Sequence, residues 1–157
     1  MVVRLGQKAP RFSLPDSDGN MRTLDEFVAM GRVLLVFFAF AFSGASDKDL
    51  CYVRDNLDSL NAVGLQPVGI GVDSVFTLKV FKHTYDFQFP LLSDYNKKVS
   101  REYGLLQDSG PFGYRGVVRR SIFVVDKRGL LRYRWMGNHS SEPRFDEVIV
   151  AVRKAPW

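Results

Sequence analysis

The sequence predicts an α/β domain built on one β-sheet. Residues 33–40 form a continuous apolar run with the length and composition of a buried strand, and residues 65–72 read as a second buried strand. Amphipathic helical patterns alternate with these runs, and a strand–turn–strand–helix pattern follows from residue 121. A parallel half followed by an antiparallel half predicts a single central mixed sheet flanked by helices. With 157 residues, 46% of them hydrophobic, we expect one domain over residues 1–157.

The chain opens with a predicted hairpin and a short helix. Residues 12–24 surround Asp18-Gly19, a dipeptide that is typical of tight hairpin turns. Thr23 and Glu26 form a capping-box pattern, which indicates the start of a helix. We expect Gly31 to end this helix just before the first long strand.

The second predicted helix runs from Ser46 to Gly64. Apolar residues recur there at spacings of three and four, which gives one apolar stripe; they are Leu50, Val53, Leu57, Leu60 and Val63. Ser74 is a good N-cap, and we expect the next helix to run from there to about Tyr85.

The remaining elements are shorter and are separated by glycines. We expect an extended piece at 89–94, a short helix at 96–103, a loop at 105–118, a hairpin formed by 121–126 and 130–135, and a closing amphipathic helix at 143–154.

Charge and hydropathy narrow the function classes. The net charge is +5, but the basic residues are dispersed except over residues 115–134, which favours a solvated basic surface over nucleic-acid binding. No apolar run is long enough to span a bilayer, so we expect no membrane partner. The N-terminus lacks the layout of a signal peptide, and we therefore expect a cytoplasmic protein.

Cysteine and histidine counts exclude several chemistries. One cysteine cannot form an internal disulfide or a cysteine-based metal site, and His83 and His139 are too few for a histidine-rich site. No glycine-rich phosphate loop is present. Neither histidine belongs to a recognisable triad, which argues against a serine hydrolase that uses Ser46.

One segment carries chemical information. Residues 36–51 read Val-Phe-Phe-Ala-Phe-Ala-Phe-Ser-Gly-Ala-Ser-Asp-Lys-Asp-Leu-Cys. This segment resembles the active-site segment of the peroxiredoxins, whose pattern is roughly Phe-Phe-Pro-x-x-Phe-Thr-x-x-Cys-x-x-Glu-Leu. Similar segments follow the family's order over nearly the whole chain, at residues 6–10, 89–94, 99–104 and 120–126.

The resemblance implies both a fold and an activity. The fold is thioredoxin-like, with an N-terminal β-hairpin. The activity is thiol-dependent reduction of hydrogen peroxide and alkyl hydroperoxides, with a thioredoxin-like protein as reductant. The resemblance implies neither a metal nor an organic cofactor. Members are often homodimers, and the aromatic side chains at 37, 38, 40 and 42 are expected in the core or in a dimer interface.

The resemblance also assigns site residues, with one conflict. Ser46 stands where the family has the cysteine that attacks peroxide, Ser43 stands for its threonine, and Arg120 for its active-site arginine. Ala39 replaces the proline and Asp49 the glutamate. A serine hydroxyl stays protonated without a partner base and forms no stable sulfenic acid. We therefore expect no peroxide turnover by this chain.

Several alternatives stay open at this site. Ser46 is either a natural loss of the cysteine or a deliberate Cys→Ser substitution, and it also fits a simple helix N-cap. The fold could serve as a non-catalytic binding or interaction module. Arg119 is the alternative to Arg120, although it would lie on the opposite face of a strand.

Cys51 is similar in its spacing to the resolving cysteine of the Q-type (bacterioferritin-comigratory) peroxiredoxins. Two alternatives are an inert buried thiol and a one-cysteine mechanism. On a helix, five residues advance about 7.5 Å and turn by about 140° net. Position 46 would then be beyond the roughly 7 Å Cα limit of a disulfide. A resolving role would therefore require the first turns of the helix to unwind.

Overall fold

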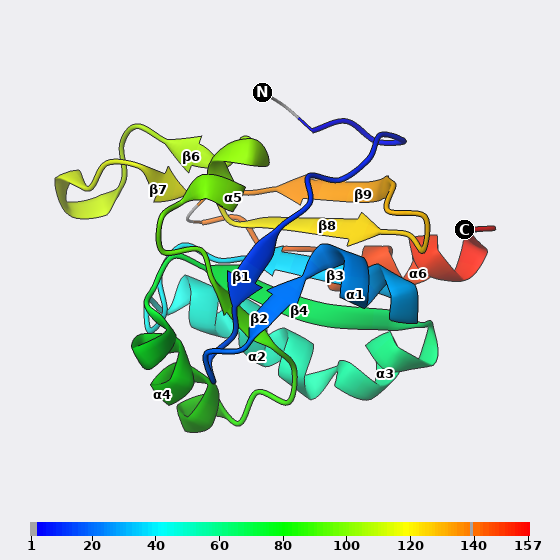
Figure 1. The fold of residues 1–157 in the computed structure, drawn as a ribbon, viewed down its shortest axis with the longest axis horizontal. Coiled ribbons are helices and arrows are strands. Elements are labelled where there is room, and N and C mark those ends of the chain that lie inside the picture. Colours follow the sequence, from blue (N-terminus) through cyan, green and yellow to red (C-terminus); the bar gives the residue numbers. More distant parts are fainter. Residues whose placement is uncertain (1–2, 139) are drawn as a thin grey trace.

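The structure is a computed structural model that describes residues 3–138 and 140–157. Its centre is a five-stranded sheet with strand order β5-β4-β3-β8-β9, in which β3, β4 and β5 are parallel and β8 and β9 antiparallel. The strands are β3 (Arg32–Phe37), β4 (Leu65–Gly71), β5 (Leu91–Ser93), β8 (Ser121–Val125) and β9 (Leu131–Met136). Figure 1 shows this sheet spanning the molecule, and the predicted mixed α/β sheet is confirmed.

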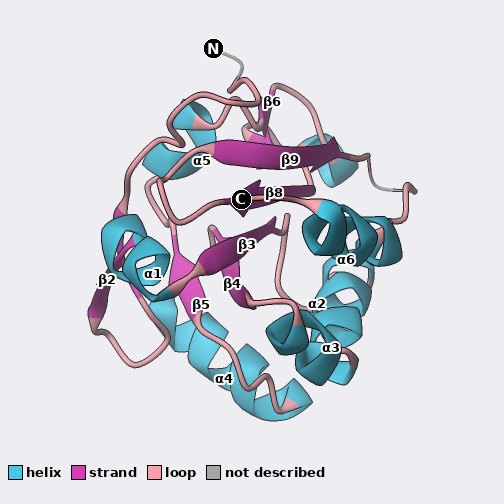
Figure 2. Ribbon diagram, turned by 90° about the vertical axis from the view of Figure 1, so that its right-hand side faces the viewer, coloured by secondary structure: helices cyan, strands magenta, loops and turns pink. Residues whose placement is uncertain are grey.

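Helices cover both faces of the sheet (Figure 2). Their bounds are α1 (Leu24–Met30), α2 (Ala45–Asp55), α3 (Leu57–Ala62), α4 (Val75–Tyr85), α5 (Lys98–Glu102) and α6 (Phe145–Lys154). Each face of the sheet has its own apolar core. Helices α1 and α5 contribute to one apolar cluster, and α2, α3, α4 and α6 contribute to the other.

Strand β3 lies between these two cores. Val33, Leu35 and Phe37 point into the first cluster, whereas Leu34 and Val36 point into the second. Successive side chains of a strand face opposite sides, so a strand covered on both faces must be apolar throughout. This explains the continuous apolar run that marks β3 in the sequence.

Two small hairpins flank the sheet. β1 (Ser13–Pro15) pairs with β2 (Met21–Thr23), as predicted, and Thr23 forms the predicted capping box at the start of α1. The second hairpin joins β6 (Leu106–Gln107) to β7 (Val117–Val118) across a 3-10 turn at Pro111–Gly113. The sequence predicts only a loop there, because its strands are too short to give a periodic signal.

The prediction of a single helix from 46 to 64 is wrong. The helix stops at Asp55, and α3 starts at Leu57, because Asn56 leaves helical geometry with φ −115° and ψ 19°. The first strand is also shorter than predicted and ends at Phe37. The apolar patterns in the sequence reveal neither boundary. The helical stripe continues across Asn56, and the apolar run of the strand continues beyond Phe37.

Ser46 is not the N-cap of its helix. That position belongs to Gly44, whose φ of 80° lies in the left-handed region that favours glycine. Ser46 is the second residue of α2 and makes a different contact, described below.

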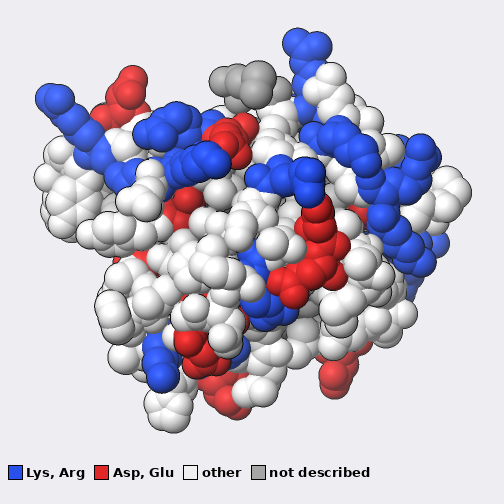
Figure 3. All heavy atoms as spheres, viewed as in Figure 1, with Lys and Arg blue, Asp and Glu red and all other residues white. Residues whose placement is uncertain are grey.

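Basic side chains gather on the right-hand side of Figure 3, over the β8–β9 hairpin. Several of them bind groups of the protein itself. Lys8 donates to the carbonyl of Arg128, Arg132 pairs with Asp126 at 2.7 Å, and Arg134 donates to the carbonyl of Val3. Across residues 3–138 and 140–157, no helix has the length and hydropathy that a bilayer span requires.

The packing of β4 against β3 generates a stability prediction. A Cβ atom at Gly71 would lie 2.3 Å from the Phe38 ring, which is fully buried and cannot move aside freely. We expect Gly71→Ala to lower the free energy of unfolding by roughly 1–3 kcal/mol, the usual cost of overpacking. Urea unfolding followed by circular dichroism measures this. Exposed Ser59→Ala is the control, and equal midpoints for both variants would refute the clash.

Candidate functional site

Ser46 lies in the first turn of α2 and is 1% exposed. Its Oγ accepts hydrogen bonds from the backbone N–H groups of Ala39 at 3.2 Å and Phe40 at 3.5 Å. Those two residues lie one residue beyond the end of β3, so the segment that leaves the central strand and the start of α2 meet at this oxygen. An atom here lies beside two backbone donors and the positive end of a helix dipole, a setting that favours negative charge.

A buried ion pair lies next to Ser46. The guanidinium of Arg120 donates from Nε and Nη2 to the two carboxylate oxygens of Asp49, both at 2.8 Å. Both side chains are nearly inaccessible, at 6% and 5% exposed. Burial raises the pKa of Asp49, and the hydrogen bond and charge of Arg120 oppose that rise. Asp49 follows Ser46 by three residues, so the two lie on the same side of α2.

Arg120 is fixed from a second direction. Its Nη1 donates to the carbonyl of Asn138 at 2.8 Å. Arg119, the alternative, instead donates to the carbonyls of Gly137 and Met136. The structure thus directs Arg120, and not Arg119, to α2.

A hollow of about 590 Å³ opens in front of these groups. Ser46, Ser43, Ala39 and Arg120 line it, and the β6–β7 hairpin forms its opposite wall. Ser43 is exposed, and among the described contacts its hydroxyl has no hydrogen bond to Ser46 or Arg120. The structure therefore brings Ser46, Ser43 and Arg120 to one cavity. Of the two residues outside α2, only Arg120 forms a described side-chain hydrogen bond to that helix.

Two polar residues of this wall are missing from the sequence prediction. Gln107 and Asn138 line the same hollow, and Asn138 also supplies the carbonyl that fixes Arg120. Gln107 lies in the stretch predicted only as a loop, where no motif marks it. The approach of residue 138 depends on the β8–β9 register, which places the end of β9 beside the start of β8.

Cys51 lies apart from this hollow. It belongs to the intact helix α2, is half-buried, and packs against the core between α2 and α4. Burial raises the pKa of its thiol, and Arg54 opposes that rise. Among the described residues, the lining of the hollow that contains Ser46 does not include Cys51.

His83 does not line the hollow that contains Ser46. His83 is exposed on α4, and His139 lies outside the described residues. Within the described part of the chain, no group of three histidine, cysteine or acidic side chains could hold a metal ion.

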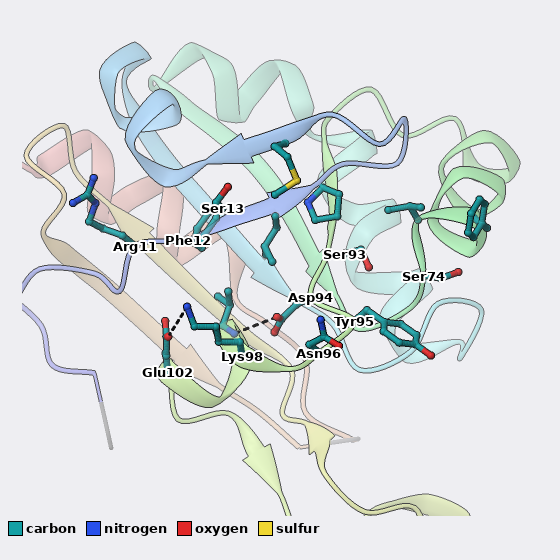
Figure 4. Close-up of a pocket in the computed structure, with 16 residues that line it drawn as sticks. Arg11, Phe12, Ser13, Ser74, Ser93, Asp94, Tyr95, Asn96, Lys98 and Glu102 are labelled. Carbon is teal, nitrogen blue, oxygen red and sulfur yellow. Dashed lines mark hydrogen bonds and ion pairs between the residues drawn. The ribbon is translucent and has the colours of Figure 1, made fainter.

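A second hollow, of about 680 Å³, lies between the β1–β2 hairpin, α4 and α5 (Figure 4). Its polar groups have structural partners. Asp94 accepts hydrogen bonds from the backbone of Val99 and Ser100 at the start of α5, and Lys98 pairs with Glu102. None of the four predicted site residues lines it.

Comparisons with known proteins agree with this geometry. The model of the AhpC/TSA family matches residues 5–134. A Coxiella burnetii protein named as a bcp peroxiredoxin is 35% identical over 137 residues, which cover 86% of this chain and 89% of the relative. Alkyl hydroperoxide reductase E of Mycobacterium bovis is 33% identical over 134 residues, 84% of each chain.

Solved structures give the same result. The crystal structure of peroxidoxin BcpB from Mycobacterium tuberculosis superposes with a TM-score of 0.85 and 27% identity, and the match covers 96% of this chain and 97% of the other. The thioredoxin-like fold is thereby confirmed. By its sequence and by its fold, the chain belongs to the AhpC/TSA family, the peroxiredoxins.

Proposed function

We propose that this chain carries the active-site framework of a thiol peroxidase for hydrogen peroxide and alkyl hydroperoxides, with a serine in the nucleophile's place. One observation carries the proposal. Position 46 lies in the first turn of α2, beside two backbone donors and the buried Arg120–Asp49 pair, at the base of an open hollow.

In the cysteine-containing form, each part of this framework has a task. A thiolate at position 46 would be stabilised by the N–H groups of Ala39 and Phe40 and by the helix terminus. Arg120 holds Asp49 and Asn138 through one N–H each on Nε, Nη1 and Nη2. A second N–H on each terminal nitrogen can then polarise the peroxide.

The reaction is a displacement at oxygen. The thiolate sulfur attacks one peroxide oxygen, the S–O bond forms, and the O–O bond breaks. The leaving oxygen departs as hydroxide or alkoxide and takes a proton, while the sulfur becomes a sulfenic acid. Ser43 is placed at the mouth of the hollow, where its hydroxyl can contact the second peroxide oxygen. With a protonated serine hydroxyl at 46, this step does not start.

Resolution of the sulfenic acid is assigned to Cys51. Its thiolate would attack the sulfur at position 46, form a disulfide and release water, after α2 has opened locally. A thioredoxin-like protein would then reduce the disulfide. These roles rest on the family resemblance and on the placement of Cys51 on the same helix.

A binding or interaction module is the second candidate. The observation that favours it is the clustering of departures from the family pattern, since Ala39, Ser43 and Ser46 all line one hollow. A site under selection for peroxide reduction would not be expected to change at three adjacent contacts.

We also propose a homodimer through exposed aromatic side chains on the β6–β7 hairpin, on α4 and in the segments that precede α2 and α5. We call this set the aromatic surface; its residues are Phe42, Phe76, Tyr95, Phe112 and Tyr114, each at least 48% exposed. Ring contacts link it to the site, because Phe112 contacts Tyr114 and Tyr114 contacts Phe40. Large exposed apolar groups that gather on one side of a protein mark an interface.

The first prediction concerns position 46. We expect the chain to consume no peroxide with dithiothreitol and Ser46→Cys to consume it. The first-turn setting should lower the thiol pKa, which alone gives roughly a ten- to thirty-fold gain in thiolate at pH 7. The control is Ser59→Cys, a cysteine on the exposed side of α3. If Ser46→Cys were no faster than this control, the binding-module alternative would stand.

The second prediction concerns the ion pair. We expect Arg120→Met to lower the free energy of unfolding by about 3–5 kcal/mol at pH 7, because Asp49 stays buried without its partner. Loss of Arg120 lets burial raise the pKa of Asp49 further. The penalty therefore grows as pH rises from about 4, where roughly half of the Asp49 carboxyl is still protonated in the unfolded chain.

Urea unfolding at several pH values measures this effect. The matched control is Arg120→Met/Asp49→Leu, which removes both charges and should recover most of the stability. An equal loss at pH 4 and pH 7 would show that the carboxylate charge is not its cause.

The third prediction concerns the dimer. We expect Phe76→Asp to weaken self-association roughly thirty-fold or more, the effect of a central interface residue. Sedimentation velocity over a concentration series measures it. Met30→Asp alters a residue of similar exposure on α1 and should leave the association constant unchanged. A monomeric parent protein would contradict the proposal directly.

A further inference from the structure

Tyr85, at the end of α4, contacts both ends of α2. Its hydroxyl donates to Oδ2 of Asp47 at 2.6 Å, in the first turn of α2. Its backbone carbonyl accepts from Nη1 of Arg54 at 2.9 Å, in the last turn. One residue of a neighbouring helix therefore fastens the beginning and the end of α2.

Cys51 lies between these two tethers. Positions 47, 51 and 54 are four and three residues apart, so their side chains form one stripe along α2. Cys51 and Tyr85 pack against the same apolar cluster. Tyr85 therefore lies over the same side of α2 that carries the Cys51 thiol.

The hydrogen bond from Tyr85 to Asp47 matters for the stability of closed α2, because the Asp47 carboxylate is buried. Asp47 is only 8% exposed, and its Oδ1 has no hydrogen-bond partner among the described atoms. Tyr85 therefore supplies the side-chain hydrogen bond to a carboxylate that is otherwise removed from water. If the hydroxyl were absent, closed α2 would hold a buried group with neither oxygen paired, whereas opened α2 would return it to water.

The loop before α2 is held to the same neighbour. Phe42 adopts a left-handed backbone with φ 65°, and its ring centroid lies 4.9 Å from that of Phe81 and 6.4 Å from that of Tyr85. The N–H of Ala41 donates to Asp73 at 2.9 Å. The closed position of the segment at 41–47 thus depends on contacts with α4 and with the end of β4.

We propose that Tyr85 is a positioning residue that holds α2 closed and thereby controls when Cys51 can reach position 46. The role given to Cys51 rests on the proposed function; the tether itself does not. Opening must break the Tyr85–Asp47 bond before the first turns can unwind, so this bond sets part of the equilibrium between closed and open α2.

The chain as it exists tests the tether by hydrogen exchange. We expect Tyr85→Phe to speed exchange of the amides at 45–52 roughly ten- to hundred-fold, the effect of losing a hydrogen bond to a buried charge. Val125→Ala, in the other core cluster, is the control for general destabilisation. It should speed exchange in the sheet but leave the locally opening amides of α2 unchanged. Unchanged exchange at 45–52 in Tyr85→Phe would overturn the proposal.

A double-mutant cycle tests whether the effect passes through Asp47. In an Asp47→Ala background, Tyr85→Phe should change exchange at 45–52 by less than about twofold, since the bond is already gone. An undiminished effect in that background would show that Tyr85 acts by packing alone and would refute the tether.

The consequence for Cys51 is tested without peroxide. In Ser46→Cys, diamide oxidises the two thiols to a disulfide. Each sulfur loses a proton and an electron, and the azo bond of diamide is reduced to the hydrazine. We expect Tyr85→Phe to speed this reaction by the same factor as exchange. Faster hydrogen exchange with an unchanged rate of disulfide formation would show that Tyr85 does not control when Cys51 reaches position 46. Failure of the proposed function would be seen separately, because the Ser46→Cys variant would then form the disulfide but consume no peroxide.

Discussion

The buried ion pair between Arg120 and Asp49 is the constraint on which the site depends. Asp49 belongs to α2, which follows the first parallel strand, and Arg120 immediately precedes β8, in the antiparallel half of the sheet. Two charges with 6% and 5% exposure are stable there only as a bidentate pair. The pair thus fixes the start of α2 relative to the far half of the sheet, and Ser46 with it.

Much of this arrangement could be predicted from the sequence, where the signal was local or periodic. The apolar run of β3, the capping box at Thr23 and the cap at Ser74 each predicted an element that the structure contains. Ser46, Ser43 and Arg120 were predicted by resemblance, and the structure places all three around one hollow. Their chemical roles remain proposals.

Other features depend on contacts that a linear pattern does not carry. Asn56 breaks an apolar stripe that continues in the sequence, and Gly44 occupies the N-cap position for which Ser46 is a sequence candidate. Gln107 enters the site on a hairpin whose strands have two residues each. Tyr85 has no motif at all; its importance comes only from the approach of α4 to α2. Long-range approach, not local propensity, decides each of these cases.

The break at Asn56 has a mechanical consequence. Helix α3 begins immediately after it and is anchored on its own by Leu60, which is fully buried. A continuous helix from 45 to 62 would transmit fraying at its first turn along a single hydrogen-bonded ladder. With the interruption, disorder that starts at the site can stop after eleven residues, while α3 stays docked on the sheet. Asn56 thus limits the extent of local unfolding: α2 can unfold while α3 keeps its packing on the sheet.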